Sequence, residues 1–378
     1  MGKERSHCAQ CGRAVGPVSS ALGLCGPCLR NVSPAHEQRV ALAHARTREP
    51  YGLPQAVPRN QEGVRCPLCG NACVVGKGER GFCGLRENRG GRLRHVAGGR
   101  RSGRVSWYLD PLPTNCVAGW VCPAGDMEGK KGPEWRRFSV SPGPEYGYTN
   151  LAVFYESCTF NCLYCQNWHF RASSQDGPLS TAEQLAAAVR DNTSCICYFG
   201  GDPASQPGHA ISASRLALRQ ARQRGRTLRI CWETNGSMAP GILRCAARLS
   251  MDSFGCVKFD LKAMDEGLHR ALTGVSNRRT LENFRRLASM GRKRPAPPFL
   301  VASTTLVPGY IDAEEVARIA RFIAECDPGI PYSLLAFQPQ FSMSDLPVTS
   351  RKLAQECLEA ARGAGLWRVH AGNIHLLT

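Results

Sequence analysis

Two hydrophobic patterns divide the chain. From Tyr148 onward, short apolar runs alternate with stretches that have helical spacing, for example residues 181–191 and 313–325. Apolar runs of this length are typical of buried strands, and strand–helix repeats indicate βα units around a parallel sheet. We expect strands at residues 151–155, 195–199, 228–232, 256–261, 299–307, 332–337 and 368–374.

Six or seven βα units are fewer than a closed eight-stranded barrel contains. The pattern therefore predicts an α/β fold that is either an open barrel or a doubly wound sheet. In both architectures the functional groups lie at the carboxyl ends of the strands. We expect the functional residues of this chain in the loops that follow its strands.

The first 147 residues have weak periodicity and many cysteines in close pairs. A polar, proline-containing stretch at 50–61 has the composition of a linker. We therefore divide the chain into three parts: a zinc-ribbon-like module at 1–48, a Cys- and Arg-rich linker with a second metal-binding segment at 49–147, and an α/β domain at 148–378.

The composition is that of a globular protein, with 43% hydrophobic and 21% charged residues in 378. The chain has no run of about 18 apolar residues that could span a bilayer. Its first residues are polar, without the apolar segment of a secretory signal. We expect a cytoplasmic protein that does not bind membranes. Its 20 cysteines then indicate metal binding, since a reducing compartment keeps thiols free.

The formal net charge is +18, and the larger share lies in the first 150 residues. A positive field of this size favours anionic partners such as nucleic acid. Arginine greatly outnumbers lysine, however, which a GC-rich gene would also produce. Charge alone therefore does not identify the partner.

A cysteine triplet follows the first expected strand of the α/β domain. Cys158, Cys162 and Cys165 have C-x3-C-x2-C spacing in one loop, and Tyr164 precedes the last of them. A [4Fe-4S] cluster is usually held by four thiolates, so three would leave one iron free for an outside ligand. An iron that binds a substrate and passes it one electron can break bonds that acid–base groups cannot. Taken alone, the spacing also fits a zinc site.

Four more motifs follow later strands. They are Gly200-Gly201-Asp202-Pro203, Trp232-Glu233-Thr234-Asn235-Gly236, Phe259-Asp260-Leu261-Lys262 and Leu306-Val307-Pro308-Gly309. With the cysteine loop, they resemble the radical S-adenosylmethionine (SAM) superfamily, and within it the pyruvate formate-lyase activating-enzyme-like proteins of a branch with an N-terminal Cys-rich extension. The resemblance runs from about residue 148 to the C-terminus and implies a partial (β/α)6-type radical SAM barrel.

The resemblance also implies the roles of these residues. Cys158, Cys162 and Cys165 would hold a [4Fe-4S] cluster whose free iron binds the amino and carboxylate groups of SAM. The implied cofactor-binding residues are Tyr164, Gly200, Gly201, Asp202, Glu233, Asn235, Asp260 and Lys262.

Within this set, each polar group has an implied partner. The glycines and Asp202 would line the amino side of SAM, whereas Lys262 and Asn235 would contact its carboxylate or ribose. Glu233 and Asp260 would jointly hold a monovalent cation. Asp202 and Glu233 differ by one methylene each from the commoner Glu and Asp of the family, which changes the reach of their contacts.

The implied activity is reductive cleavage of SAM, which gives a 5'-deoxyadenosyl radical that abstracts hydrogen from a substrate. The likeness to activating enzymes implies a glycine of a partner protein as substrate, and an electron donor such as flavodoxin or ferredoxin. The alternative is a radical SAM enzyme that modifies RNA and binds it through the basic, Cys-rich N-terminal region. The sequence identifies no catalytic residue outside the cofactor site.

The N-terminal cysteines have the spacing of a zinc ribbon. Cys8 and Cys11 form one C-x2-C pair, and Cys25 and Cys28 form another. Two such pairs supply four thiolates to a tetrahedral zinc ion, although a rubredoxin-like iron site has the same spacing. We expect zinc in a structural role, with nucleic-acid or protein binding as the alternative.

A second cysteine group is less regular and fits either zinc or a second iron–sulfur cluster: Cys66, Cys69, Cys73 and Cys83. The stretch 80–88 resembles the leader of the activating-enzyme-like branch. Cys116 and Cys122 could complete this ligand set or replace one of its members. The other cysteines lie in apolar strand-like or helical settings and are expected to be small core residues: Cys195, Cys197, Cys231, Cys245, Cys256, Cys326 and Cys357.

Overall fold

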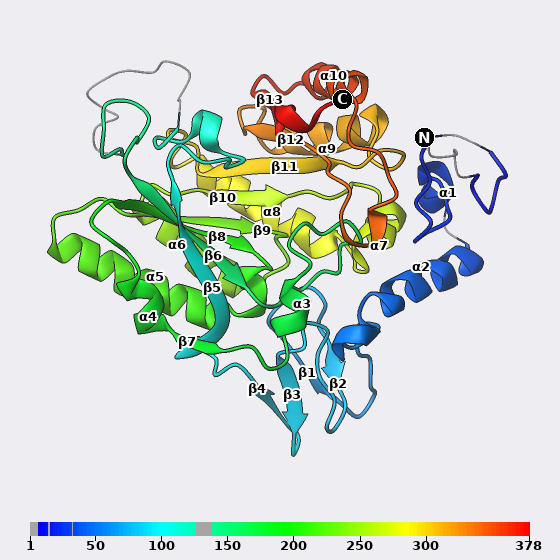
Figure 1. Ribbon diagram of the computed structural model, residues 1–378, viewed down its shortest axis with the longest axis horizontal. Coiled ribbons are helices and arrows are strands. Elements are labelled where there is room, and N and C mark those ends of the chain that lie inside the picture. Colours follow the sequence, from blue (N-terminus) through cyan, green and yellow to red (C-terminus); the bar gives the residue numbers. More distant parts are fainter. Residues whose placement is uncertain (1–6, 14–15, 32, 126–137) are drawn as a thin grey trace.

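The computed structural model describes residues 7–13, 16–31, 33–125 and 138–378, and a nine-stranded sheet lies at its centre (Figure 1). All seven expected strands are present within a few residues of their predicted bounds, which confirms the α/β fold with a central parallel sheet. These parallel strands are β6 (Thr149–Tyr155), β8 (Thr193–Gly200), β9 (Arg229–Thr234), β10 (Val257–Asp260), β11 (Leu300–Leu306), β12 (Tyr332–Ala336) and β13 (Val369–Gly372).

Two antiparallel strands extend the sheet beyond β6. β5 (Ser102–Pro111) pairs with β6, and β7 (Leu179–Thr181) pairs with the start of β5. The resulting order is linear, β13-β12-β11-β10-β9-β8-β6-β5-β7, so the sheet stays open. β5 belongs to the segment 49–147, in which the sequence pattern shows a linker and no strand. This segment therefore contributes a long strand to the main sheet.

Helices follow most of the parallel strands and cover the outer face of the sheet (Figure 1). In α9 (Ala313–Cys326), for example, Val316, Ile319 and Ile323 recur every three or four residues and are buried against the sheet. None of the helices in the described ranges has the length and apolarity to cross a membrane. The outer helices are α4 (Ala182–Ala187), α5 (Pro207–Gln223), α6 (Pro240–Asp252), α7 (Glu266–Thr273), α8 (Arg278–Gly291), α9 (Ala313–Cys326) and α10 (Arg351–Gly363).

The inner face of the sheet lines a cavity, whereas the outer face is covered by packed helices. Side chains from five neighbouring strands line a single cavity: Tyr108, Ala152, Cys195, Cys231 and Lys258, from β5, β6, β8, β9 and β10. Only a curved sheet brings five adjacent strands to one cavity, so the sheet forms a partial barrel.

The remaining elements lie in the N-terminal region and in the connections, and all but α2 (Pro34–Arg46) have five residues or fewer. They are α1 (Gly26–Arg30), α2 (Pro34–Arg46), η1 (Glu49–Tyr51), β1 (Val64–Arg65), β2 (Val74–Val75), β3 (Arg86–Arg89), β4 (Arg92–His95), η2 (Gly119–Val121), α3 (Phe170–Ser173), η4 (Pro203–Ser205), η5 (Phe341–Met343) and η6 (Ile374–Leu376).

The N-terminal module packs on the barrel beside the loop that follows β11. Arg30 Nη2 lies 2.9 Å from a carboxylate oxygen of Asp312, and the Ser19 N–H donates to the Tyr310 hydroxyl at 2.9 Å. Both partners belong to the connection between β11 and α9. The module is therefore attached to the same barrel that carries the expected cofactor site.

A buried ion pair fixes the segment that precedes β6. Arg229 Nη1 donates to Glu145 Oε1 at 2.8 Å, and both side chains are fully buried. Glu145→Ala leaves the guanidinium buried without its carboxylate, and breaking such a pair costs about 3–5 kcal/mol. We expect the free energy of unfolding to fall by this amount in anaerobic urea unfolding of the metal-loaded protein.

The matched control is Arg224→Ala. Arg224 forms an exposed ion pair with Asp191, and exposed pairs contribute about 0–1 kcal/mol. Equal losses of stability in the two variants would show that burial does not set the strength of the Glu145–Arg229 pair.

Candidate functional site

The cysteine loop between β6 and α3 is tied to the end of α7. The Asn161 N–H donates to the Thr273 carbonyl at 2.9 Å, and the Leu163 N–H donates to the Leu272 carbonyl at 3.0 Å. These bonds satisfy backbone groups that a buried loop would otherwise leave unpaired. They fix the part of the loop that carries the three cysteines.

The side chain of Asn161 is fully buried and holds the same loop. Its amide nitrogen donates to His44 Nδ1 at 3.0 Å and to Thr47 Oγ1 at 2.8 Å, and its oxygen accepts from Arg171 Nη2 at 3.0 Å. Sequence reasoning missed this residue, although a polar side chain between two cluster cysteines was a signal. Asn161 positions the loop and does not line the cleft.

Residues of the N-terminal half also bond to the loop. Ser157 Oγ donates to the Cys83 carbonyl at 2.8 Å, and Asn71 Nδ2 donates to the Thr159 carbonyl at 2.7 Å. Phe160 of the loop packs in one apolar cluster with Cys66 and Cys73. The second cysteine group therefore lies directly against the first cysteine triplet.

The three loop cysteines line one cleft at the carboxyl ends of β8, β9 and β10. Parallel strands have their carboxyl ends at the same edge of the sheet, and the sequence analysis predicted the functional residues in the loops at this edge. Seven of the eight expected cofactor residues line this cleft: Tyr164, Gly201, Asp202, Glu233, Asn235, Asp260 and Lys262.

The two expected glycines have different roles. Gly200 does not line the cleft, and a Cβ there would lie 2.0 Å from the ring of Phe154, so close packing requires glycine. Gly201 has a φ of +58°, and a Cβ would lie 1.9 Å from the Tyr155 carbonyl oxygen. Only glycine fits this turn, which brings the backbone to the rim of the cleft.

The Asp202 carboxylate is buried and satisfied by neighbouring donors. Its Oδ1 accepts from the Ala204 N–H at 2.6 Å, and its Oδ2 accepts from the Asn235 N–H at 2.7 Å and from the Thr234 hydroxyl at 3.1 Å. Burial raises the pKa of Asp202 to about 6, although the N–H groups of Asn235 and Ala204 lower it. Asp202 therefore joins the loop after β8 to the loop after β9.

Glu233 and Asp260 each have a lysine as partner. Lys258 Nζ lies 3.2 Å from Glu233 Oε2, and Lys262 forms an ion pair with Asp260. The two acids were expected to hold one monovalent cation together. Each acid also has an ammonium partner, since Lys258 and Lys262 both reach the barrel interior, and the shared cation stays a prediction. Lys258, inside an apolar strand, was missed by the sequence analysis.

Besides Glu233 Oε2, which faces the Lys258 ammonium, two polar atoms in the cleft have no hydrogen-bond partner among the described residues. They are the Tyr164 hydroxyl and Asp260 Oδ1, and both are buried. Lys262 Nζ, which pairs with the other carboxylate oxygen of Asp260, lies 5.3 Å from the centre of the Tyr164 ring. Buried polar groups of this kind are usually paired. The cleft therefore fits a ligand that brings its own donors and acceptors, such as an amino-acid group.

Two of the loop thiols, those of Cys158 and Cys162, are protonated in the absence of metal. Burial raises the pKa of Cys158 well above its ordinary value, and the charge of Asp202 adds to this. Burial raises the pKa of Cys162 to about 12, although the Lys262 ammonium opposes it. A metal that binds here must displace these protons.

The cysteine spacing alone fits either a radical SAM cluster or a zinc site, and the comparison with protein families favours the first. The model of the radical SAM superfamily matches residues 152–323, the span that holds the cysteine loop and the three strand ends. The chain carries a radical SAM domain. This match confirms the family resemblance and indicates an enzyme; the family uses a [4Fe-4S] cluster and SAM.

Three relatives show how far the likeness extends. The isethionate sulfite-lyase activating enzyme of Desulfovibrio desulfuricans is 38% identical over 42% of this chain and 46% of its own length. The pyruvate formate-lyase 1-activating enzyme of Escherichia coli is 28% identical over 45% of this chain and 66% of its own. The uncharacterized protein MJ0808 of Methanocaldococcus jannaschii is 24% identical over 82% of this chain and 81% of its own.

The chain thus spans less than half the length of the first of these relatives. The match to MJ0808 covers 317 residues and extends well beyond the radical SAM domain. The Cys-rich N-terminal region is therefore shared in part with a relative of similar extent.

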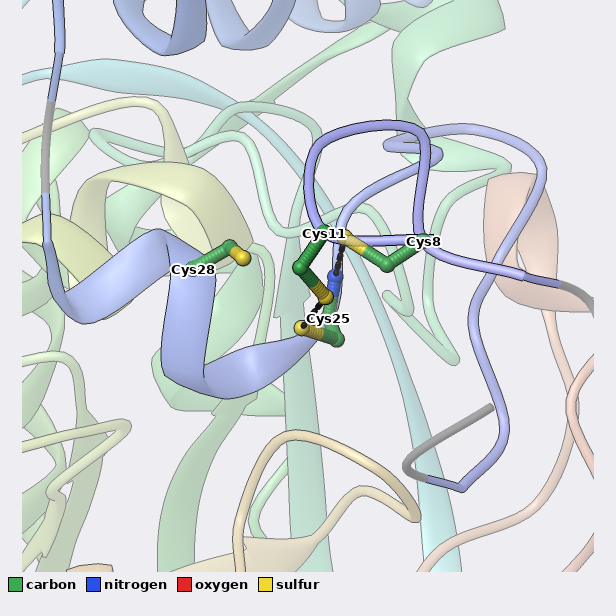
Figure 2. A group of neighbouring side chains, drawn as sticks. All are labelled: Cys8, Cys11, Cys25 and Cys28. Atoms are coloured by element: carbon green, nitrogen blue, oxygen red, sulfur yellow. Dashed lines mark hydrogen bonds between the residues drawn. The ribbon is translucent and has the colours of Figure 1, made fainter. Parts of the chain in front are cut away.

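The N-terminal cysteines form a compact group outside the radical SAM domain. The four sulfur atoms of Cys8, Cys11, Cys25 and Cys28 lie within 4.8 Å of one another (Figure 2). Burial opposes ionisation, but backbone N–H groups of Cys11, Cys25 and Gln10 lower the pKa of Cys8 to about 6. Zinc–sulfur bonds of about 2.3 Å place tetrahedral thiolates at similar spacing. The group fits a metal ion, and zinc stays the predicted one.

The second cysteine group is less compact. Within the described ranges, only the N-terminal group brings three or more ligand atoms within 4.8 Å of one another. Burial raises the pKa of Cys73 to about 11. The metal of the second group therefore stays a prediction.

The sequence spacing suggested that Cys116 and Cys122 could belong to the second cysteine group. In the structure they lie elsewhere. They line the cavity on the inner face of the sheet, beside cysteines of β8, β9 and β10. The cause is β5, which carries the chain away from residues 66–83 to the barrel before Cys116.

The compact N-terminal group yields a metal-content prediction. We expect about one zinc ion per chain at this group, since four thiolates complete a tetrahedral site. Cys28→Ser should remove that ion and lower the thermal midpoint, because metal binding stabilises such modules directly. Metal analysis by mass spectrometry measures the zinc, with Cys245→Ser as the control, since Cys245 is an exposed cysteine outside all three groups. Unchanged zinc in Cys28→Ser would refute the site.

Proposed function

We propose that this protein is a radical SAM enzyme in which Cys158, Cys162 and Cys165 hold a [4Fe-4S] cluster. The observation that carries the proposal is the cleft, where three thiols from one loop meet polar groups from three strand ends. A cluster takes one thiolate per iron, so three cysteines leave the fourth iron for SAM. When bound, the cluster supplies the electron that cleaves SAM to methionine and a 5'-deoxyadenosyl radical.

The cleft residues would bind and orient SAM. Lys262 would pair with its carboxylate, and the free oxygen of Asp260 with its amino group, because opposite charges in a buried site form strong hydrogen bonds. The Tyr164 hydroxyl is also open to a polar partner. Asn235 is held by Thr159, to which its Nδ2 donates at 2.8 Å, and so stands at the rim of the cysteine loop.

Asp202 would act on SAM through its neighbours. Its oxygens are already occupied by Ala204, Thr234 and Asn235. It would therefore fix the backbone of the two loops that border the cofactor. This is a positioning role, in place of the direct contact with the amino group that the family resemblance implied.

The substrate we propose is a glycine of a partner protein, and the electron donor a flavodoxin or ferredoxin. The support is the similarity to two kinds of activating enzyme. The alternative substrate is RNA, for which the support is the net charge of +18. Cytoplasmic location goes with either substrate and stays a prediction.

SAM cleavage tests the proposed chemistry. Anaerobic protein with dithionite and SAM should produce 5'-deoxyadenosine, and Cys162→Ala should reduce the rate by at least about 100-fold, because the cluster loses one of its three ligands. Cys245→Ala, with an exposed cysteine on α6, should cleave SAM at the native rate. Equal product from Cys162→Ala and the native protein would rule out the proposed cluster.

A salt titration distinguishes the two substrate classes. Phosphate contacts from many arginines make RNA binding fall steeply with salt. Under the protein-substrate proposal, we expect tRNA to show no saturable binding at 150 mM salt in fluorescence anisotropy. Tight binding to tRNA that weakens with a steep salt slope would favour RNA as the substrate.

A further inference from the structure

A second cavity lies inside the barrel, on the side of the cleft toward the amino ends of the strands. Six of the 20 cysteines line it: Cys116, Cys122, Cys195, Cys197, Cys231 and Cys256. Four of them come from β8, β9 and the start of β10, and two come from the connection between β5 and β6 that covers the cavity. No local spacing motif joins them, so only the fold brings them together.

Strand geometry places the sheet cysteines on the inner face. Cys195 and Cys197 are two residues apart, and alternate residues of a strand point to the same side. Cys197 is in register with Cys231 of the neighbouring strand, and the Trp232 N–H donates to the Cys256 carbonyl at 3.0 Å. The three strands therefore present a row of thiols to the cavity.

The simplest account is that these cysteines are small core residues. Two observations oppose it. Core side chains pack without large voids, whereas these line a cavity of about 310 Å³. The cavity also contains a buried cation, which an apolar core does not stabilise.

That cation is Lys258, whose side chain is only 1% exposed. Its ammonium nitrogen lies 3.0 Å from Cys197 Sγ, 3.2 Å from Cys116 Sγ and 3.2 Å from Glu233 Oε2. Glu233 balances the charge of the lysine, and the two sulfurs accept its remaining hydrogen bonds. Ammonium groups that donate to sulfur stabilise anionic sulfur ligands.

Cys231 is in register with Cys197 and packs in one cluster with Cys197 and Cys256. The fold therefore groups thiols from three adjacent strands.

The arrangement favours a cluster over a single ion. Adjacent strands lie about 4.8 Å apart, so cysteines on three strands are spread more widely than the ligands of one tetrahedral ion. In the described part of the chain, no three of these sulfurs fall within 4.8 Å of one another. In a cluster, each thiolate binds a different iron, so wider separation is required.

We propose that this cavity holds a second [4Fe-4S] cluster, bound by Cys116, Cys197, Cys231 and Cys256, with Lys258 donating hydrogen bonds to its sulfur ligands. Transfer of a preassembled, thiolate-ligated cluster breaks its four iron–sulfur bonds to the carrier thiolates and forms four to the protein cysteines. The displaced thiolates take up the thiol protons, and no electron is gained or lost. The same face carries the cofactor cleft, since Phe199 lines both cavities. The second cluster would thus border the cleft in which SAM is proposed to bind.

The test measures iron and does not depend on SAM cleavage. The variant Cys158→Ala/Cys162→Ala/Cys165→Ala removes the proposed first cluster. After anaerobic reconstitution, we expect it to retain about four irons per chain, with the Mössbauer spectrum of a [4Fe-4S] cluster. Adding Cys231→Ala should remove this iron. Adding Cys357→Ala, at a fully buried cysteine of α10, should leave it unchanged.

The competing location is the second cysteine group. We therefore also add Cys66→Ala/Cys73→Ala to the triple variant. If this change removes the residual iron and Cys231→Ala does not, the proposal is wrong. It is also wrong if the triple variant itself binds no iron. Cys116→Ala repeats the test at a loop residue, where folding is less affected, and circular dichroism reports the fold. Loss of iron in that folded variant supports the site, and retention of all four irons contradicts it.

Lys258→Met tests the hydrogen bonds to sulfur. Without the ammonium donor, we expect the reduction potential of the second cluster to become more negative, since donors to cluster sulfurs raise it. A purely structural lysine would change stability and leave the potential of the retained cluster unmoved. Potentiometry on the triple cysteine variant, followed by electron paramagnetic resonance, measures this shift.

Discussion

The hydrogen-bonded register of the parallel sheet decides which residues of this protein can meet. Because neighbouring strands run in one direction, their carboxyl ends share one edge, and Asp202, Asn235 and Asp260 reach the same cleft from three strands. The register acts along the strands as well. Cys197 lies beside Cys231, so their side chains share the inner face. The cleft and the cysteine-lined cavity are therefore two levels of one barrel interior, both fixed by backbone pairing.

Charge inside this barrel is arranged in compensated groups. Glu233 contacts Lys258, Asp260 contacts Lys262, and Asp202 is surrounded by backbone and hydroxyl donors. A buried charge is tolerated when it is paired and hydrogen-bonded. Such pairs also hold their dipoles in place, so a charged ligand meets groups that are already oriented. The polar interior is thus consistent with binding a zwitterionic cofactor and disfavours an apolar one.

Sequence reasoning identified the parts of the fold and of the site that local patterns encode. Buried parallel strands are short apolar runs, so all seven were predictable. β5 was not, because it lies in a segment of weak periodicity and its partner β6 follows only after a long connection. Motif residues of the cleft were found, whereas Asn161 and Lys258 carry no motif and depend on neighbours distant in the sequence. Cys116 and Cys122 were grouped by chain spacing, which cannot show that β5 redirects the chain between them and residues 66–83.

The N-terminal region bears on the chemistry through the cysteine loop. Asn71, Cys83 and His44 bond to residues between Ser157 and Asn161, so the loop that would hold the cluster is supported from outside the radical SAM domain. Without these partners, several buried polar groups of the loop would be unpaired, at about 1–3 kcal/mol each. A metal held by the second cysteine group, which includes Cys83 and spans Asn71, would therefore also help to order the cluster loop. This coupling gives the Cys-rich extension a physical role in the cofactor site that needs no contact with substrate.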